Sequence, residues 1–365
     1  MAIYFFIYTI CFLTMFWDKP SISISSKKRI IVFPITVLTL FFGLRWQCGT
    51  DWDQYYWDFR DLTWDNFMNF NRYGEQNLEI GFAFVNILLK SIGLGSYTFY
   101  LLVTNLCRFL LIAYVSFKLS KYPIVTFFGF LSLQYMFPTR NPYATALFFV
   151  GFIFIKSKEF RKYFFSWLGA CFIHVSSIIV LPIYWLHGLR LKFKYQTVLY
   201  ISTIVFAALF ASLLQTIGAS LSFGYGTIDE KIATYSQAFR EEEGSRGYIS
   251  MLIPFVFICL FEYVRKFTKM NHEERTFFDF MVICYIIATG IWNLFMNTMP
   301  DLCRFVEFIN TWPLLVPYIL NKYRKYFGLS IFVLVIYYLY RMNNTIGLGL
   351  YHDLFVPYRT IFGTL

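Results

Sequence analysis

Residues 99–117 read FYLLVTNLCRFLLIAYVSF, an apolar run that contains a single charged residue, Arg108. A helix needs about 20 such residues to cross the hydrocarbon core of a bilayer, so this run predicts a transmembrane helix. Comparable runs recur along the whole chain, at residues 2–17, 30–44, 123–138, 142–156, 163–186, 195–217, 248–264, 276–298, 305–320 and 327–345. The sequence therefore predicts an all-α polytopic integral membrane protein.

The composition agrees with this fold class. Apolar residues make up 58% of the 365 residues and charged residues only 15%, whereas soluble domains are about 25% charged. These values exclude a soluble enzyme, a disordered chain and a disulfide-rich secreted module. No polar stretch is long enough to fold alone, so we expect residues 1–365 to form a single integral membrane domain. The net charge of +11 comes from basic residues in short loops, which favours a charge bias across the membrane rather than nucleic-acid binding.

The basic clusters also predict the topology. The positive-inside rule places Lys27-Lys28-Arg29 and Lys118 in the cytoplasm. The chain must then cross an even number of times between them, so residues 79–94 should form an interfacial or re-entrant helix. Residues 163–186 have basic clusters on both sides, which favours a hairpin of two short helices with its tip near His174, although the segment is also long enough for one continuous helix. The total is about 10–12 transmembrane helices, and both termini face outward.

Arginines and acids gather on the outer side of this topology. Outer loops are predicted at about 45–78 and 218–247. The first loop begins with Arg45, whose planar guanidinium suits a phosphate or a carboxylate, and Asp51 and Asp53 follow. Alternatively, Arg45 is a structural residue whose charged end reaches the membrane interface beside a belt of aromatic side chains.

Four further motifs carry candidate functional residues. Glu79 opens an apolar stretch, Arg140 and Arg304 lie at the outer ends of apolar runs, and His174 lies within one. Each has a structural alternative: a carboxylate at a helix N-terminus, a boundary arginine, or a histidine satisfied inside the protein. The chain has no H-E-x-x-H motif and no cluster of His and Cys. We therefore predict no metal site and no cofactor.

Taken in order, these motifs resemble the EpsG family of Wzy-type polysaccharide polymerases, over nearly the whole chain. The resemblance rests on Leu44-Arg45, Gly49-Thr50-Asp51, Tyr55, Glu79-Ile80-Gly81-Phe82, Arg140 with Ala144, Phe172 with His174-Val175-Ser176-Ser177, Arg304-Phe305 and Pro357-Tyr358. One departure concerns the backbone around the second arginine. The family often has Gln after it, whereas Asn141-Pro142 follows Arg140 here.

The resemblance implies a reaction and its location. Such enzymes join oligosaccharide repeat units carried on undecaprenyl pyrophosphate, at the outer face of the bacterial inner membrane. The growing glycan moves from its lipid pyrophosphate onto a sugar hydroxyl of a new lipid-linked unit. The implied partners are these lipid-linked oligosaccharides, the bilayer and a chain-length regulator protein. The resemblance leaves open whether the product is O-antigen, capsule or exopolysaccharide.

This chemistry assigns roles to the candidate residues. Preorganised guanidinium groups can stabilise a departing pyrophosphate, which makes three arginines candidate pyrophosphate-binding residues: Arg45, Arg140 and Arg304. The acceptor hydroxyl needs a general base, for which the catalytic candidates are Asp51, His174 and Glu79, with the first two favoured. Further candidate substrate-binding residues are Tyr55, Asp53 and Tyr358.

Other functions remain compatible with the composition. An O-antigen ligase would use the same type of donor with a finished lipid core as acceptor, and a membrane O-acyltransferase would also handle glycans. A flippase or transporter of lipid-linked sugars should carry charges deep along a central path. Here most notable charges lie at one margin, with Arg108 the exception, and the order of the motifs favours the polymerase.

Overall fold

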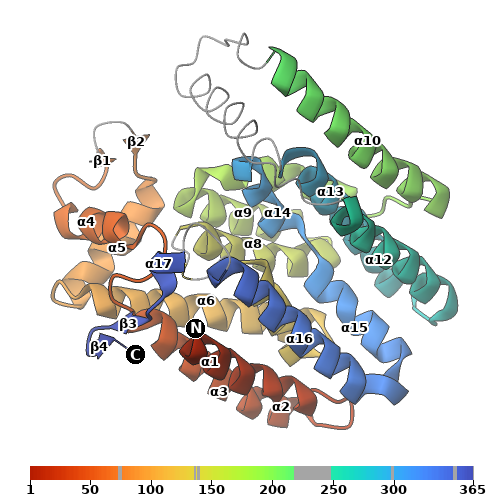
Figure 1. The fold of residues 1–365 in the computed structure, drawn as a ribbon, viewed down its shortest axis with the longest axis horizontal. Coiled ribbons are helices and arrows are strands. Elements are labelled where there is room, and N and C mark those ends of the chain that lie inside the picture. Colours follow the sequence, from red (N-terminus) through yellow and green to blue (C-terminus); the bar gives the residue numbers. More distant parts are fainter. Residues whose placement is uncertain are drawn as a thin grey trace. The chain divides into compact units, whose positions relative to one another are not determined.

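The computed structural model describes residues 1–72, 76–134, 137, 140–217, 248–296, 300–347 and 352–364. The described residues are mostly helical (Figure 1). Their strands form two antiparallel pairs, and each strand is two residues long. The predicted all-α membrane fold is confirmed. The predicted outer loop at 218–247 lies outside the described residues. The chain forms two compact units, Met1–Leu181 with Tyr323–Leu365, and Pro182–Lys322.

The first unit is built around α6. Because this helix is long and apolar on most sides, it packs against α3, α5, α7 and α8, while α8 packs against α9. The bounds of its elements are α1 Ala2–Leu13, η1 Thr14–Trp17, α2 Ile24–Ile30, α3 Val32–Gly43, α4 Trp52–Asp61, β1 Asn71–Arg72, β2 Gln76–Asn77, α5 Ile80–Ile92, α6 Tyr97–Leu119, α7 Pro123–Leu133, α8 Arg140–Lys156, α9 Phe160–Ile173, η5 Arg324–Tyr326, α16 Phe327–Ile346, α17 His352–Phe355, β3 Arg359–Thr360 and β4 Gly363–Thr364.

The second unit surrounds α13, whose residues are buried along most of its length. It packs against α10, α12, α14 and α15. The elements are α10 Phe193–Ile217, α12 Tyr248–Phe267, α13 His272–Phe295, η4 Pro300–Phe305, α14 Val306–Ile309 and α15 Trp312–Lys322. The predicted span 305–320 is thus two helices. Asn310 accepts a hydrogen bond from the Trp312 amide (3.0 Å), and Pro313 lies in the first turn of α15, so the sequence starts a new helix there.

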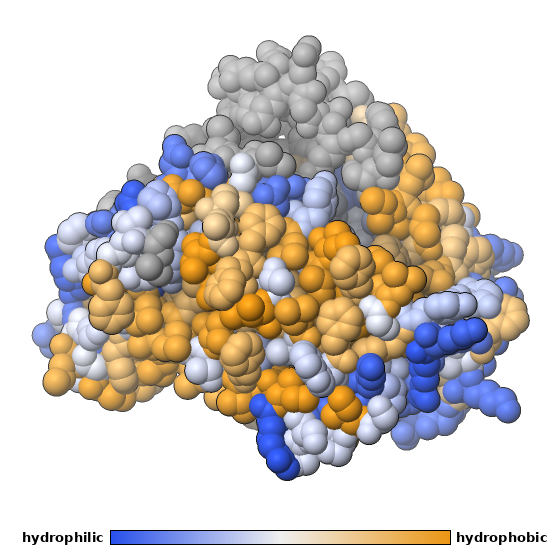
Figure 2. All heavy atoms as spheres, turned by 60° about the horizontal axis from the view of Figure 1, so that its bottom comes forward, coloured by the Kyte–Doolittle hydropathy of each residue, from blue (hydrophilic) through white to orange (hydrophobic). Residues whose placement is uncertain are grey.

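Within the described residues, three helical stretches are long and apolar enough to cross a membrane. They are Tyr97–Leu119, His272–Phe295 and Arg324–Ile346, which contain α6, α13 and α16 respectively. The exposed face of α16 is apolar, with Leu329 and Phe332 both more than half exposed, where a soluble protein would carry polar side chains. Figure 2 shows how much of the visible surface is apolar. Lipid is the solvent that such a surface requires.

The hairpin predicted in residues 163–186 is confirmed. Helix α9 ends at Ile173, His174 is extended (φ −152°, ψ 112°), and the 3-10 helix η2 follows at Val175–Leu186. The Tyr163 hydroxyl donates to the Val180 carbonyl over 2.8 Å. In one continuous helix these residues would lie about 25 Å apart, so the chain reverses at His174.

The C-terminal tail packs on the first fifty residues. The Gly49 amide donates to the Leu354 carbonyl (2.7 Å), and the Trp46 amide donates to the Arg359 carbonyl (2.9 Å). The Tyr4 hydroxyl donates to the Phe355 carbonyl (2.6 Å). Figure 1 shows both chain ends beside β3 and α1. The tail therefore supplies the hydrogen-bond partners of the turn that follows α3.

A buried ion pair fixes the start of α7. Lys27 Nζ lies 2.9 Å from Asp18 Oδ1, and both side chains are almost fully buried. Asp18 Oδ2 also accepts from the Val125 amide (2.9 Å), which satisfies an otherwise unpaired N–H in the first turn of that helix. The pair thus links the segment after α1 to α2 and α7.

Asp18→Asn should destabilise the protein by about 3–5 kcal/mol, because it leaves the Lys27 ammonium buried without its counterion. Equilibrium unfolding in mixed detergent micelles measures this change. Glu159→Gln is the matched control, since its ion pair with Lys162 is exposed and exposed pairs contribute little. Equal effects of the two substitutions would contradict a structural role for the buried pair.

Candidate active site

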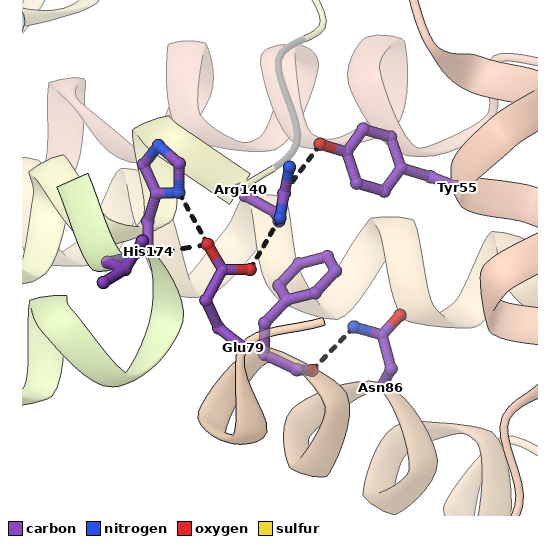
Figure 3. Close-up of polar contacts among 7 residues, drawn as sticks. Tyr55, Glu79, Asn86, Arg140 and His174 are labelled. Atoms are coloured by element: carbon purple, nitrogen blue, oxygen red, sulfur yellow. Dashed lines mark hydrogen bonds and ion pairs between the residues drawn. The ribbon is translucent and has the colours of Figure 1, made fainter. Parts of the chain in front are cut away.

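Four side chains that are distant in the sequence meet in the first unit (Figure 3). Arg140 Nη1 donates to Glu79 Oε2 over 2.6 Å, and Arg140 Nε donates to the Tyr55 hydroxyl over 2.9 Å. The other carboxylate oxygen of Glu79 lies 3.0 Å from His174 Nδ1. Glu79 is therefore the hub of a network that joins α4, α5, α8 and the turn of the α9–η2 hairpin.

Local backbone features aim these side chains at one another. Glu79 immediately precedes α5 and Arg140 begins α8. The extended His174 interrupts the helical path, and the Val175 amide also donates to Glu79 Oε1 (3.4 Å). Helix ends leave polar groups unpaired, so the network forms where three helices begin or end.

Gly81 lets two of these elements approach closely. A Cβ at this position would lie 2.6 Å from the carbonyl oxygen of Phe172, a distance that requires the backbone to move. Phe172 lies two residues before His174 and Gly81 two residues after Glu79. The absence of a side chain at Gly81 therefore allows the carboxylate and the imidazole to meet.

The environment keeps Glu79 ionised. Burial of the carboxyl acts to raise its pKa, but the hydrogen bond from His174 and the charge of Arg140 outweigh burial and lower the pKa to about 2. So weak a base is poorly suited to remove a proton from a hydroxyl at neutral pH. Glu79 is suited to orient its two partners instead.

The carboxylate also defines the tautomer of His174. An ionised carboxylate only accepts hydrogen bonds, so in neutral His174 the proton is assigned to Nδ1, facing Glu79. Nε2 then carries the lone pair that can accept a proton. The His174 side chain is 11% exposed, which shields it from bulk water without sealing it.

Arg45 lies inside the protein and outside the network. Its side chain is 1% exposed, and Nη1 donates to the carbonyls of Cys48 (3.2 Å) and Phe137 (3.0 Å). Gly49 adopts φ +104°, and a Cβ there would lie 2.9 Å from Arg45 Nη1, so glycine is needed at this turn on both counts. Arg45 thereby ties the turn after α3 to Phe137, which lies three residues before Arg140.

A second buried arginine holds the same segment. Arg108, 2% exposed within α6, donates from Nε to the side-chain oxygen of Gln134 over 2.9 Å. Gln134 directly follows α7. Two arginines therefore fix residues 134 and 137 on the path to Arg140, a role that the sequence motifs around Arg45 and Arg108 did not reveal.

The other candidate residues occupy different places. Asp51 and Asp53 are exposed at the start of α4, away from the buried face that carries Tyr55. Tyr358 is 2% exposed; its hydroxyl donates to the Phe41 carbonyl, and its ring stacks on Phe41. Arg304 is exposed in η4 of the second unit. The described residues contain no group of three or more His, Cys, Asp and Glu that could hold a metal ion.

The Gly81→Ala substitution should destabilise the protein by about 1–3 kcal/mol, because the added methyl clashes with the backbone at Phe172. Gly169→Ala in α9 is the control, since a Cβ there meets nothing within 4 Å. Thermal unfolding in detergent compares the two. A wild-type midpoint for Gly81→Ala would show that α5 and α9 do not need this close approach.

The low pKa of Glu79 predicts how acid weakens the fold. A depressed pKa stabilises the folded state above the unfolded value of 4.5, and this contribution of about 3 kcal/mol is lost as the pH falls towards 2. Glu79→Gln should therefore unfold more readily than wild type at pH 7, and the difference should shrink between pH 4.5 and 2. A difference that does not change with pH, measured by unfolding in mixed micelles, would contradict the ionised hub.

Comparisons with known proteins identify the chain's family. The EpsG family model matches residues 28–360, nearly the whole chain. No curated protein and no solved structure gives a significant match. The matched region contains every residue of the network, and the resemblance seen in the sequence motifs is confirmed. The chain belongs to the EpsG family, a family of Wzy-type polysaccharide polymerases.

Proposed function

We propose that this protein lengthens a polysaccharide by glycosyl transfer between lipid-linked units at the outer face of the bacterial inner membrane. The donor is the growing glycan on undecaprenyl pyrophosphate, and the acceptor is a sugar hydroxyl of a new undecaprenyl-pyrophosphate-linked repeat unit. The family supports polysaccharide polymerisation in general. The main support for glycosyl transfer is the Arg140–Glu79–His174 network, in which Glu79 holds a candidate base, His174, and a positive charge, Arg140, in fixed positions.

His174 is the proposed general base. Its Nε2 takes the proton of the acceptor hydroxyl as the acceptor oxygen bonds to the anomeric carbon of the donor. Glu79 accepts the Nδ1 proton in a hydrogen bond and stabilises the imidazolium that forms, as the carboxylate does in a catalytic triad. The exposed Asp51 lacks such an arrangement, so the geometry favours His174 over the other candidates. A single base is what an inverting transfer requires.

Arg140 is the proposed partner of the leaving group. The bond between the anomeric carbon and the pyrophosphate oxygen breaks, and its electron pair remains on the pyrophosphate. A guanidinium already fixed by Tyr55 and Glu79 can stabilise that charge without reorganising. Arg45 adds a buried positive charge near Phe137 and holds the approach to Arg140. On its sequence motif we also propose Arg304 as a pyrophosphate-binding residue, and Asp53 and Tyr358 as substrate contacts.

The test uses purified protein reconstituted in vesicles with lipid-linked repeat units. Wild type should produce a ladder of longer glycans on a gel, and His174→Ala should slow it by about 10²–10⁴-fold. His272→Ala is the control, because that histidine is exposed at the start of α13 and should leave the ladder intact. Translocation of the substrate without lengthening would overturn the proposed function.

If Arg140 stabilises the leaving group, its variants should differ from His174→Ala in their reaction rates and in their rescue by imidazole. Arg140→Lys keeps the charge but loses the planar fork of donors, so its rate should lie between those of wild type and Arg140→Ala. Added imidazole should partly restore His174→Ala, which lacks only the base, and should not restore Arg140→Ala. Equal rescue of both variants, measured as the initial rate of ladder formation, would remove the distinction between base and leaving-group partner.

A further inference from the structure

Helix α4 has two different faces. Trp52, Tyr55 and Phe59 are each at most 6% exposed and pack in an aromatic cluster with residues of α5 and α6. The opposite face exposes Asp53, Trp57, Arg60 and Asp61. These four residues, here called the α4 outer face, recur every three or four positions and so lie on one side of the helix.

We propose that the α4 outer face binds the carbohydrate portion of the acceptor. This inference rests on the proposed function and adds a substrate-binding surface to it. The feature to explain is Trp57, a large aromatic side chain that is 42% exposed in a strongly charged setting.

Exposure to lipid does not account for Trp57. Asp53 lies one turn before it and Asp61 one turn after it, and both are exposed. Carboxylates on the same helix face cannot enter the hydrocarbon without a large cost. The α4 outer face is therefore in contact with water, where the exposed part of the indole offers a ligand a flat apolar surface.

The residues of the α4 outer face contact one another, and Lys90 ties their backbone to α5. The Arg60 guanidinium lies 4.0 Å from the centre of the Trp57 ring and binds both oxygens of Asp61, over 2.7 and 3.2 Å. Lys90 of α5 donates to the carbonyls of Arg60 (2.6 Å) and Leu62 (2.7 Å). A surface fixed before binding loses less conformational entropy when a ligand arrives.

These groups match a sugar better than a phosphate. An indole face packs against the C–H groups of a pyranose ring, and carboxylates accept hydrogen bonds from hydroxyls. The two carboxylates are balanced by the Arg60 guanidinium and the adjacent Lys90 ammonium, so the α4 outer face offers no net positive charge to attract pyrophosphate or anionic lipid headgroups. An uncharged polyhydroxyl ligand fits both the charge and the aromatic ring.

The same helix connects the α4 outer face to the active site. Tyr55 lies between Asp53 and Trp57 in the sequence, and its hydroxyl accepts the hydrogen bond from Arg140. Successive residues of a helix are 1.5 Å apart along its axis. Tyr55 is therefore close to Asp53 and Trp57 along the axis but lies on the opposite face of the helix. Sugars on the α4 outer face would lie about one helix diameter from the network, a distance that an oligosaccharide can span.

The test compares Trp57→Ala with Trp17→Ala, whose indole is 53% exposed at the end of η1. The probe is the lipid-free repeat-unit oligosaccharide, released by hydrolysis from polysaccharide made in cells that express the protein. Calorimetry should show binding weakened at least about tenfold in Trp57→Ala and unchanged in Trp17→Ala. In the polymerisation assay, Trp57→Ala should raise the acceptor KM by a larger factor than it lowers kcat.

Further variants separate this inference from the proposed function. Trp57→Phe should keep most of the binding, because it keeps an aromatic face, and Asp53→Asn should weaken binding without disturbing a packed side chain. His174→Ala should bind the oligosaccharide like wild type while failing to transfer it. Wild-type binding by both Trp57→Ala and Asp53→Asn would overturn the carbohydrate surface, whereas an active His174→Ala would overturn the base and leave that surface standing.

Discussion

The candidate site depends on the hydrogen bonds that the ionised Glu79 carboxylate makes to Arg140 and His174. Its two oxygens serve two different partners, so one side chain sets both the position of the Arg140 charge and the tautomer of His174. A buried carboxylate is costly unless its hydrogen bonds are satisfied, and this one is satisfied by groups from α8 and from the turn after α9. The cost of burial thus favours the single arrangement in which all three helix ends meet.

The support for this arrangement extends well beyond the network. Phe137 and Gln134 lie before Arg140, and each is held by a buried arginine from elsewhere in the first unit. On the other side, the absence of a Cβ at Gly81 brings α5 against α9. Precise placement of reacting groups requires such supporting contacts. Residues that never touch substrate can therefore be as necessary to activity as those that do.

The fold could be predicted further from the sequence than the site could. Long apolar runs predict helices because a helix pairs its backbone polar groups within a single segment inside lipid. The charge bias favoured the reversal at His174. The break of the 305–320 run at Asn310 was missed, although its capping residue and proline are visible in the sequence. Glu79, Arg140 and His174 could each be selected as unusual residues, but their pairing depends on how helices pack. Arg45 is the clearest example of what the sequence could not show. Its motif indicated a residue that binds an anion, whereas the structure shows that its Nη1 donates to backbone carbonyls.

The tail contacts have a consequence for biogenesis. Arg45 lies in a turn whose backbone pairs with residues 354–361, so the partners of this turn are made about 300 residues after it. The intervening helices enter the membrane before these contacts can form. Such long-range pairing is slow to form, and the turn around Arg45 stays incomplete until residues 354–361 have been made. A nascent chain that has not reached residue 361 lacks the backbone contacts that hold this turn, so the first unit can be completed only late, after its helices have been inserted.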